Sequence, residues 1–327
     1  MAIIPKKLKP GDHIRVVSPS ISLAIISESQ IAQATQALEG LGLTISFSQH
    51  AKELDDFRSS SVASRVTDLH DAFADPTVDG ILTTLGGYNA NQLLPHLDYD
   101  LIQKHPKPFC GFSDITALQL AILAKANLIT YSGPHFSTFG MKLGVDYTVD
   151  QFVQCVMSDD RLTVEPADHW SDDMWFSDQE NRTFHQHGGY IIVNEGVGSG
   201  QIVGGNLCTF NLTHGTEFYP HLDDHILLLE DDFESSLATF DRDLQSVLHL
   251  PDAGKITGLL IGRFQTESNV DRDLLIKMLK AKPELQHIPI VIEASFGHVT
   301  PFFTFPQGGT GRLSAQNGKV AFTIDQH

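Results

Sequence analysis

Three side chains of types that cooperate in acyl transfer follow predicted β-strands of this 327-residue chain. They are Ser113, Glu230 and His298, in that order along the sequence. A histidine with a pKa of about 6.5 can take the proton of a serine hydroxyl, and a carboxylate on its other ring nitrogen fixes its tautomer. Because ligands of open α/β sheets gather beyond the carboxyl ends of the strands, the three residues are candidates for nucleophile, general base and orienting acid.

Each candidate also has a simpler structural interpretation. Ser113 or Asp114 could only cap the following helix, since both types are favoured N-caps, and the G-x-S-x-G turn is absent. Glu230 could be a solvated loop carboxylate, and His298, one of 16 histidines, could be a hydrogen-bonded core residue. Together, however, the three residue types favour catalysis at a site formed where the two halves of the chain meet.

Two glycine pairs could bring backbone N–H groups close to a substrate, because glycine has no Cβ. Gly86 and Gly87 follow a predicted strand. Gly204 and Gly205 precede Asn206, whose amide can both donate and accept hydrogen bonds. Neither G-x-G-x-x-G nor G-x-x-x-x-G-K-[ST] is present, so a phosphate cradle is not expected. A tight loop is the alternative for both pairs.

Metal catalysis is the alternative chemistry. His185 and His187 supply ligand types, as do Asp223, Asp224 and His225, but the H-E-x-x-H spacing is absent. We therefore predict neither a metal nor another cofactor.

Strands alternate with helices in the first half of the chain, which predicts crossovers and a mostly parallel, doubly wound sheet. Strands are expected at 14–18, 44–47, 80–85 and 128–132, and helices at 31–38, 62–73 and 116–126. The second half predicts a β/α lobe, with strands at 190–193, 226–229, 257–261 and 288–292 and helices at 235–248 and 271–280. A hairpin is expected around Asn317-Gly318, a strong turn signal.

A polar, aromatic stretch separates the halves. We predict an N-terminal α/β lobe at 1–150 carrying the serine, and a C-terminal lobe at 165–327 carrying the glutamate and histidine. Residues 151–190 then form a linker and an aromatic substrate loop. Trp170 and Trp175 lie in this loop, where an exposed indole is costly unless something stacks on it. Packing in the core or between the lobes is the alternative for both.

Charge and composition exclude several classes of protein. With 40 acidic and 22 basic side chains, the net charge of −18 repels nucleic acid and anionic lipid. No apolar run approaches the roughly 20 residues that span a bilayer, and the start of the chain is not typical of a signal peptide. Three scattered cysteines without a C-x-x-C pair indicate a reducing, cytoplasmic setting.

Six segments, in order, resemble the LD-carboxypeptidase family of serine peptidases, and the resemblance covers nearly the whole chain. The segments are 11–20, 85–88, 111–116, 204–207, 229–231 and 296–298. The resemblance implies a catalytic triad of Ser113, Glu230 and His298 and an oxyanion hole from backbone N–H groups near Asp114 and Gly87. It also implies no metal, a cytoplasmic location and a homodimer.

Within the family, residues 89–100, the tryptophan-containing loop and residues 205–211 are most similar to the microcin-immunity branch. Members of this branch cleave the amide between an acidic aminoacyl group and a nucleotide, and an aromatic side chain stacks on the base. The resemblance assigns the stacking to Trp175 or, as the second choice, Trp170. It assigns substrate contacts to Asn206 and to the backbone at Gly86.

One departure from the branch bears on the substrate. Glu230 is followed by Asp231, Asp232, Phe233 and Glu234, with no Lys or Arg to meet a phosphoryl group. An acidic aminoacyl or peptide amide therefore fits better than an anionic phosphoramidate. Two alternatives remain: a murein tetrapeptide carboxypeptidase that releases D-alanine, and a non-catalytic ligand-binding protein on the same scaffold.

Overall fold

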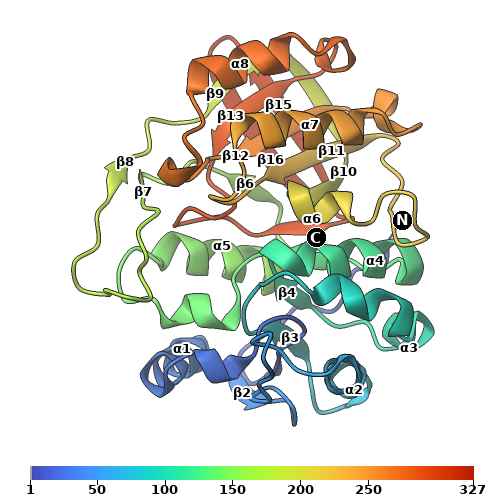
Figure 1. Ribbon diagram of the computed structural model, residues 1–327, viewed down its shortest axis with the longest axis vertical. Helices are drawn as coiled ribbons and strands as arrows, with labels where there is room; N and C mark the ends of the chain where they lie inside the picture. The colour runs from blue at the N-terminus through green and yellow to red at the C-terminus, as the bar shows by residue number, and fades with distance from the viewer. Residues whose placement is uncertain (1) are drawn as a thin grey trace.

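The computed structural model describes residues 2–327, which form two lobes, one above the other in Figure 1. The lower lobe contains a six-stranded sheet. Its strands are β1 (His13–Val17), β2 (Thr44–Phe47), β3 (Gly80–Thr83), β4 (Phe109–Gly111), β5 (Thr130–Ser132) and β14 (Phe305–Gln307). Their order is β14-β5-β4-β3-β1-β2, and every neighbouring pair is parallel except β14 with β5.

Helices cover both faces of this sheet, as a doubly wound fold requires. They are α1 (Glu28–Gly40), α2 (Val62–Ala74), α3 (Tyr99–Lys104), α4 (Thr116–Ala126) and α5 (Asp146–Val156). The apolar sides of α1 and α5 pack in one hydrophobic cluster, and those of α2 and α4 pack in another. Ser27 and Ser61 accept hydrogen bonds as the N-caps of α1 and α2, which explains where these helices begin.

The upper lobe contains an eight-stranded sheet. Its strands are β6 (Leu162–Val164), β9 (Ile191–Asn194), β10 (Gly196–Asn206), β11 (His225–Glu230), β12 (Gly258–Gly262), β13 (Ile290–Ala294), β15 (Thr310–Gln316) and β16 (Lys319–Gln326). In the order β6-β16-β15-β10-β11-β12-β13-β9, only the central strands β10 to β13 are parallel. The helices of this lobe are α6 (Leu207–Asn211), α7 (Leu237–Leu248) and α8 (Arg272–Lys280).

Smaller elements complete the chain. A two-stranded ribbon of β7 (His169–Trp170) and β8 (His185–Gln186) stands at the side of the molecule (Figure 1). Short 3₁₀ helices cover 23–25, 90–96, 113–115, 136–140, 253–255, 266–268 and 283–285. The predicted two-lobed α/β fold with its parallel N-terminal sheet is thus confirmed.

Strand β10 is the main element that the sequence patterns missed. Gly204 and Gly205 were expected in a turn, but they belong to the last part of this eleven-residue strand. Its sequence, GVGSGQIVGGN, is rich in glycine, which strands usually avoid. Pairing with β11 on one side and β15 on the other stabilises it despite this composition. The hairpin was predicted correctly, since Asn317 and Gly318 both have positive φ angles between β15 and β16.

The two lobes are connected by a strand and by a common hydrophobic core. Strand β14 comes from the C-terminal half of the chain, yet it is the edge strand of the N-terminal sheet. One hydrophobic cluster contains Val16 of β1, Leu228 of β11 and Phe305 of β14. Because this core is continuous, the two sheets pack against each other, and side chains on their facing edges can meet.

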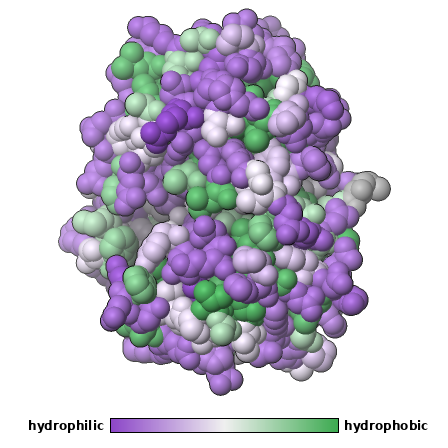
Figure 2. Space-filling view, turned by 45° about the vertical axis from the view of Figure 1, so that its right-hand side comes forward, coloured by the Kyte–Doolittle hydropathy of each residue, from purple (hydrophilic) through white to green (hydrophobic). Residues whose placement is uncertain are grey.

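The surface is mostly hydrophilic, as the large number of charged residues in the composition leads one to expect. Hydrophilic residues cover most of the face seen in Figure 2, with small hydrophobic groups between them. Among the helices of residues 2–327, none combines the length and the apolar character needed to cross a membrane.

Candidate active site

Ser113 occupies a sharp turn between β4 and α4. Its φ angle of 60° is in the left-handed region, which is uncommon for a residue with a side chain and is found where a site constrains the backbone. The capping interpretation does not hold, because neither Ser113 nor Asp114 accepts a cap hydrogen bond from this helix. The Asp114 carboxylate instead accepts hydrogen bonds from the Ser20 hydroxyl at 2.5 Å and from the Ala90 N–H at 2.8 Å.

The structure brings the three separated candidates together. His298 Nε2 lies 3.0 Å from Ser113 Oγ, and His298 Nδ1 lies 2.7 Å from Glu230 Oε2. Glu230 ends β11, and His298 follows β13 through a turn at Gly297. Gly297 has a φ of +103°, and a Cβ there would lie 2.6 Å from Glu230 Oε2. The glycine therefore makes room for the carboxylate beside the imidazole.

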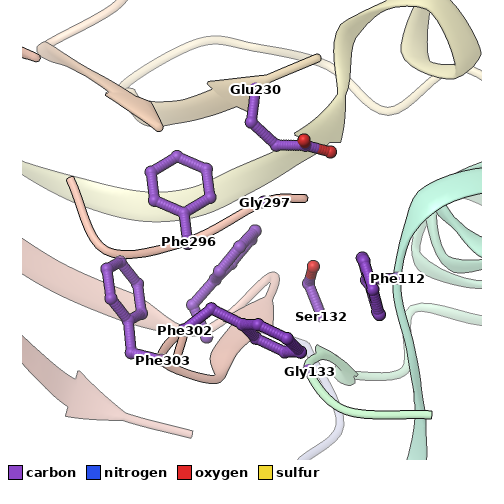
Figure 3. Close-up of a pocket in the computed structure, with 9 residues that line it drawn as sticks. Phe112, Ser132, Gly133, Glu230, Phe296, Gly297, Phe302 and Phe303 are labelled. Atoms are coloured by element: carbon purple, nitrogen blue, oxygen red, sulfur yellow. The ribbon is translucent and has the colours of Figure 1, made fainter. Parts of the chain in front are cut away.

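The surroundings of Glu230 are apolar on one side. Figure 3 shows its carboxylate beside a small cavity lined by phenylalanines 112, 296, 302, 303 and 305. The residue is 2% exposed, so its charge acts on His298 with little screening by water. Burial alone would lower the pKa of His298, but the charge and hydrogen bond of Glu230, assisted by Asp232 and Asp231, raise this pKa to about 9.

Gly86 and Gly87 lie beside the serine. A Cβ on Gly86 would come within 2.9 Å of Ser113 Cβ, so a larger residue would displace the serine. Gly87 and Asp114 line the same cavity as Ser113. Outside helices and strands, no backbone–backbone hydrogen bond of residues 2–327 uses the N–H of either residue.

Two cavities of similar size meet at the Ser113–His298 pair. The first, of about 420 Å³, is the aromatic cavity: it is lined by His298 together with Phe112, Met174, Trp175, Phe176, Phe233 and Phe302. The second, of about 380 Å³, is the acidic cavity: it is lined by Ser113, Gly87, Asn206 and Cys208 together with Asp114, Asp231, Asp232 and Glu234. His298 lines only the aromatic cavity and Ser113 only the acidic cavity.

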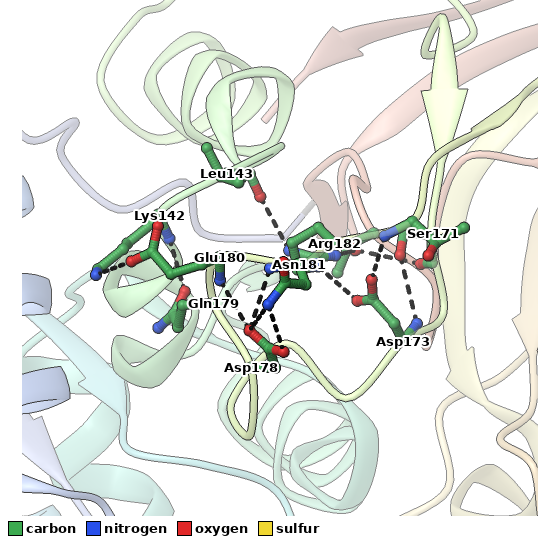
Figure 4. Close-up of polar contacts among 11 residues, drawn as sticks. Lys142, Leu143, Ser171, Asp173, Asp178, Gln179, Glu180, Asn181 and Arg182 are labelled. Carbon is green, nitrogen blue, oxygen red and sulfur yellow. Dashed lines mark hydrogen bonds and ion pairs between the residues drawn. The ribbon is translucent and has the colours of Figure 1, made fainter.

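The loop that carries Trp175 is anchored at both ends (Figure 4). Arg182 donates to Asp173 at 2.5 Å, to the Leu143 carbonyl at 2.9 Å and to Thr300 Oγ1 at 3.0 Å. Its side chain is 1% exposed. Because Thr300 lies two residues after His298, this arginine connects the aromatic loop to the segment that holds the imidazole.

The two tryptophans occupy different environments. Trp175 lines the aromatic cavity and packs edge-on against Phe176. Trp170 lines neither cavity. Its ring lies over the Arg263 guanidinium at 4.7 Å and packs against His185 at 4.8 Å. The structure therefore gives Trp170 a packing role at the base of the loop.

Asn206 has a structural role inside the acidic cavity. Its Oδ1 accepts from the Thr209 N–H at 3.0 Å and caps α6, and its Nδ2 donates to Asp231 Oδ1 at 3.2 Å. Asn206 also lines the acidic cavity.

His135 is a residue of the aromatic cavity that the sequence patterns did not reveal. His135 Nδ1 lies 2.7 Å from Thr83 Oγ1. Its Nε2 atom is buried without a partner among residues 2–327. Burial, followed by the positive charge of His298, lowers the pKa of His135 to about 3, so the ring stays neutral. The only feature of the sequence that could have pointed to His135 is its position shortly after a predicted strand.

The candidate metal ligands have other partners. His187 contacts Ser295 Oγ at 2.9 Å, and His225 contacts the Asp223 carbonyl at 2.7 Å. Within residues 2–327, no group of three or more His, Cys, Asp or Glu side chains is arranged to hold a metal ion.

Comparison with known proteins identifies relatives along nearly the whole chain. Residues 14–133 match the LD-carboxypeptidase N-terminal domain, and residues 199–313 match the LD-carboxypeptidase C-terminal domain. The protein YocD of Bacillus subtilis (strain 168) is 53% identical over 98% of this chain and 99% of its own length. The crystal structure of an MccF-like protein from Bacillus anthracis str. Ames has a TM-score of 0.98 at 51% identity, covering 100% of both chains.

More distant relatives have names that refer to two substrates. The microcin C7 self-immunity protein MccF of Escherichia coli is 28% identical over 98% of this chain and 96% of its own. The structure of MccF in complex with glutamyl sulfamoyl guanosine has a TM-score of 0.89 at 25% identity, covering 99% of this chain and 98% of that one. The murein tetrapeptide carboxypeptidase of Pseudomonas aeruginosa is 26% identical over 77% of this chain and 76% of its own.

Proposed function

This chain belongs to the LD-carboxypeptidase family, and we propose on that basis that it is a serine-type hydrolase that cleaves the amide bond of a small aminoacyl or peptide substrate. The observation that carries the proposal is the continuous hydrogen-bonded chain from Ser113 Oγ through His298 to Glu230, with distances of 3.0 and 2.7 Å. The position of Gly87 and Asp114 in the same cavity as Ser113, and a second cavity on the side of His298, support it.

The reaction has two steps. Ser113 Oγ attacks the carbonyl carbon while His298 Nε2 accepts its proton, and the N–H groups of Gly87 and Asp114 stabilise the oxyanion. The C–N bond then breaks, and the imidazolium gives the proton to the departing amine. Water attacks the acyl-enzyme in the second step, with His298 as its base, and the proton returns to Ser113. Glu230 orients the imidazole and stabilises its charged form.

The positions of the two cavities indicate which part of the substrate lies on which side of the Ser113–His298 pair. His298 protonates the departing nitrogen, so the amine portion lies on the side of the histidine, in the aromatic cavity. The acyl group stays bonded to Ser113, so it lies in the acidic cavity. An aminoacyl group joined to a base or another aromatic amine fits this arrangement. The structural neighbour MccF was solved in complex with glutamyl sulfamoyl guanosine, which also joins an aminoacyl group to a nucleoside.

The test is hydrolysis of a panel that contains aminoacyl sulfamoyl nucleosides and an L,D-linked tetrapeptide. Wild type is expected to cleave at least one substrate, and Ser113→Ala to lose roughly 10³-fold or more in kcat while it remains folded. Ser246→Ala, an exposed serine on α7, is the matched control and should retain full activity. Full activity of Ser113→Ala would refute the proposal. Labelling of Ser113 by a fluorophosphonate would argue against a purely ligand-binding role.

Release of D-alanine from the tetrapeptide is the second candidate function. The murein tetrapeptide carboxypeptidase of Pseudomonas aeruginosa among the relatives favours it. The aromatic lining with Trp175 argues for a larger amine portion than alanine. Comparison of kcat/KM between the two substrate classes decides between them.

A further inference from the structure

The side chain of Asp114 is a buried acid at the place where the proposed reaction develops negative charge. The residue follows Ser113 directly and is 2% exposed. Its backbone N–H is one of the two proposed oxyanion donors, but an ionised carboxylate nearby repels an oxyanion. A residue of this type at this position therefore calls for a further role that offsets the repulsion.

Three loops meet near Asp114, because they follow three neighbouring strands of the N-terminal sheet. Strands β1, β3 and β4 lie side by side in it and are parallel. The first loop, residues 18–22, follows β1, and the second, residues 84–90, follows β3 and contains Gly87. The third is the turn at Ser113 after β4. The distance from the Gly87 N–H to Ser113 Oγ therefore depends on how the second loop lies against the other two.

The Asp114 carboxylate connects all three loops. Its Oδ2 accepts from the Ser20 hydroxyl at 2.5 Å, in the first loop, and from the Ala90 N–H at 2.8 Å, in the second. Ala90 begins the 3₁₀ helix at 90–96, and Asn89 before it provides no side-chain cap. Asp114 supplies this cap from a different segment, and a carboxylate is favourable at the N-terminal end of a helix.

Arg65 makes a second connection between the first two loops. It comes from α2 and is 3% exposed, and its Nη1 donates to the Pro19 carbonyl at 3.1 Å and to the Asn89 carbonyl at 3.2 Å. Burial raises the pKa of Asp114, whereas its hydrogen bonds and the charge of Arg65 act to lower this pKa. The guanidinium thus holds the two loops together and also favours the ionised form of Asp114.

Gly87 lies directly against the first loop. Its φ is +151°, and a Cβ there would lie 2.3 Å from Ser20 Oγ. The glycine therefore allows the backbone of the second loop to approach the serine that is bound to Asp114. Close contact prevents the second loop from moving toward Ser20, and the hydrogen bonds of Asp114 and Arg65 oppose movement away from it.

We propose that Asp114 acts through its side chain as a positioning residue, which together with Ser20 and Arg65 holds the Gly87 N–H where it can donate to the oxyanion formed at Ser113. The effect on rate rests on the proposed function, whereas the connection between the loops is a property of the fold. Fixed geometry offsets the repulsion between the carboxylate and the oxyanion, since a misplacement of about 1 Å can cost on the order of 100-fold in rate.

Two variants test the effect on rate. Asp114→Asn keeps the shape of the side chain but leaves only one acceptor oxygen, and Ser20→Ala removes a single hydroxyl. Each is expected to lower kcat about tenfold or more for a substrate that wild type cleaves, with KM within about twofold, because the oxyanion exists only beyond the ground state. The rate at which a fluorophosphonate labels Ser113 should fall in parallel.

Asp12→Asn is the matched control. Asp12 is also a buried carboxylate that accepts a backbone N–H, from Lys9 at 3.0 Å, but it precedes β1 at the opposite end of the sheet. It should lower the melting temperature without changing kcat or the labelling rate. Unchanged or increased kcat in folded Asp114→Asn and Ser20→Ala would overturn the proposal. If Asp114→Asn fails to fold, Ser20→Ala decides.

Hydrogen exchange tests the connection without turnover. The backbone amides of residues 84–92 should exchange about tenfold faster in Asp114→Asn and in Ser20→Ala than in wild type, and at the wild-type rate in Asp12→Asn. Unchanged protection of this segment in both site variants would overturn the proposal. A wild-type protein that neither cleaves a substrate nor reacts with the fluorophosphonate would count against the proposed function instead, and the exchange rates would still decide on the connection.

Discussion

His298 Nε2 lies 3.0 Å from Ser113 Oγ, although 185 residues separate the two in the chain. The serine belongs to the N-terminal lobe and the histidine to a turn after β13 of the C-terminal lobe. A hydrophobic cluster joins both lobes, and the return of β14 to the N-terminal sheet connects them as well. The reactivity of the serine therefore depends on how the two lobes pack against each other.

The pH dependence should report the state of His298. A general base must be neutral, and the pKa of about 9 keeps the free imidazole mostly protonated at neutral pH. We expect kcat/KM to rise with pH and to be half-maximal near pH 9. Asp232→Asn removes one of the charges that raise this pKa, so its midpoint should fall, whereas Glu39→Gln should leave the midpoint in place. A profile that is flat from about pH 7 to 9.5 would contradict this role for His298.

Gly297→Ala should separate the glutamate from the histidine. The new Cβ would lie 2.6 Å from Glu230 Oε2, at a φ of +103°. We expect kcat to fall by about tenfold or more, because the imidazole loses its orienting hydrogen bond. Gly318→Ala is the matched control: its φ is also positive, at +72°, but its Cβ would meet nothing within 4 Å. It should cost stability in thermal unfolding without changing kcat, and equal kcat values for the two variants would argue against this explanation.

The two tryptophans should give different phenotypes. Trp175→Ala removes a ring from the aromatic cavity, so KM should rise by about tenfold for substrates with an aromatic amine portion, while Trp175→Phe should lose less. Trp170→Ala removes the ring that covers Arg263 and should lower the melting temperature with little effect on KM. Steady-state kinetics and thermal unfolding of the three variants test this, and a larger KM effect at Trp170 would reverse the assignment.

Arg182→Met should loosen the aromatic loop. The change keeps the length of the stem but removes the contacts to Asp173, the Leu143 carbonyl and Thr300. We expect roughly 2 kcal/mol lower stability, faster proteolysis within 171–183 and a higher KM for aromatic amine portions. Lys142→Met removes the exposed pair with Glu180 in the same region and should change these quantities little. Equal protease sensitivity of the two variants would show that Arg182 does not anchor the loop.

The sequence determined the local features of this protein. Hydrophobic periodicity and turn residues predicted most strands and helices, including the hairpin at Asn317-Gly318, because these signals arise from neighbours in the chain. They also marked Ser113, Glu230 and His298 as side chains at strand ends. Strand β10 was missed because its glycines give no local strand signal, and only pairing with β11 and β15 forms it.

Only the tertiary structure decided distances, burial and charge. It brought Ser113 within reach of His298, and it placed Trp175 in a cavity and Trp170 against Arg263. The physical reason is that desolvation and Coulomb interactions depend on every group nearby in space, and most of those groups come from distant parts of the chain. A run of acidic residues therefore looks like a solvated loop in the sequence, yet it forms the wall of a cavity in the folded protein.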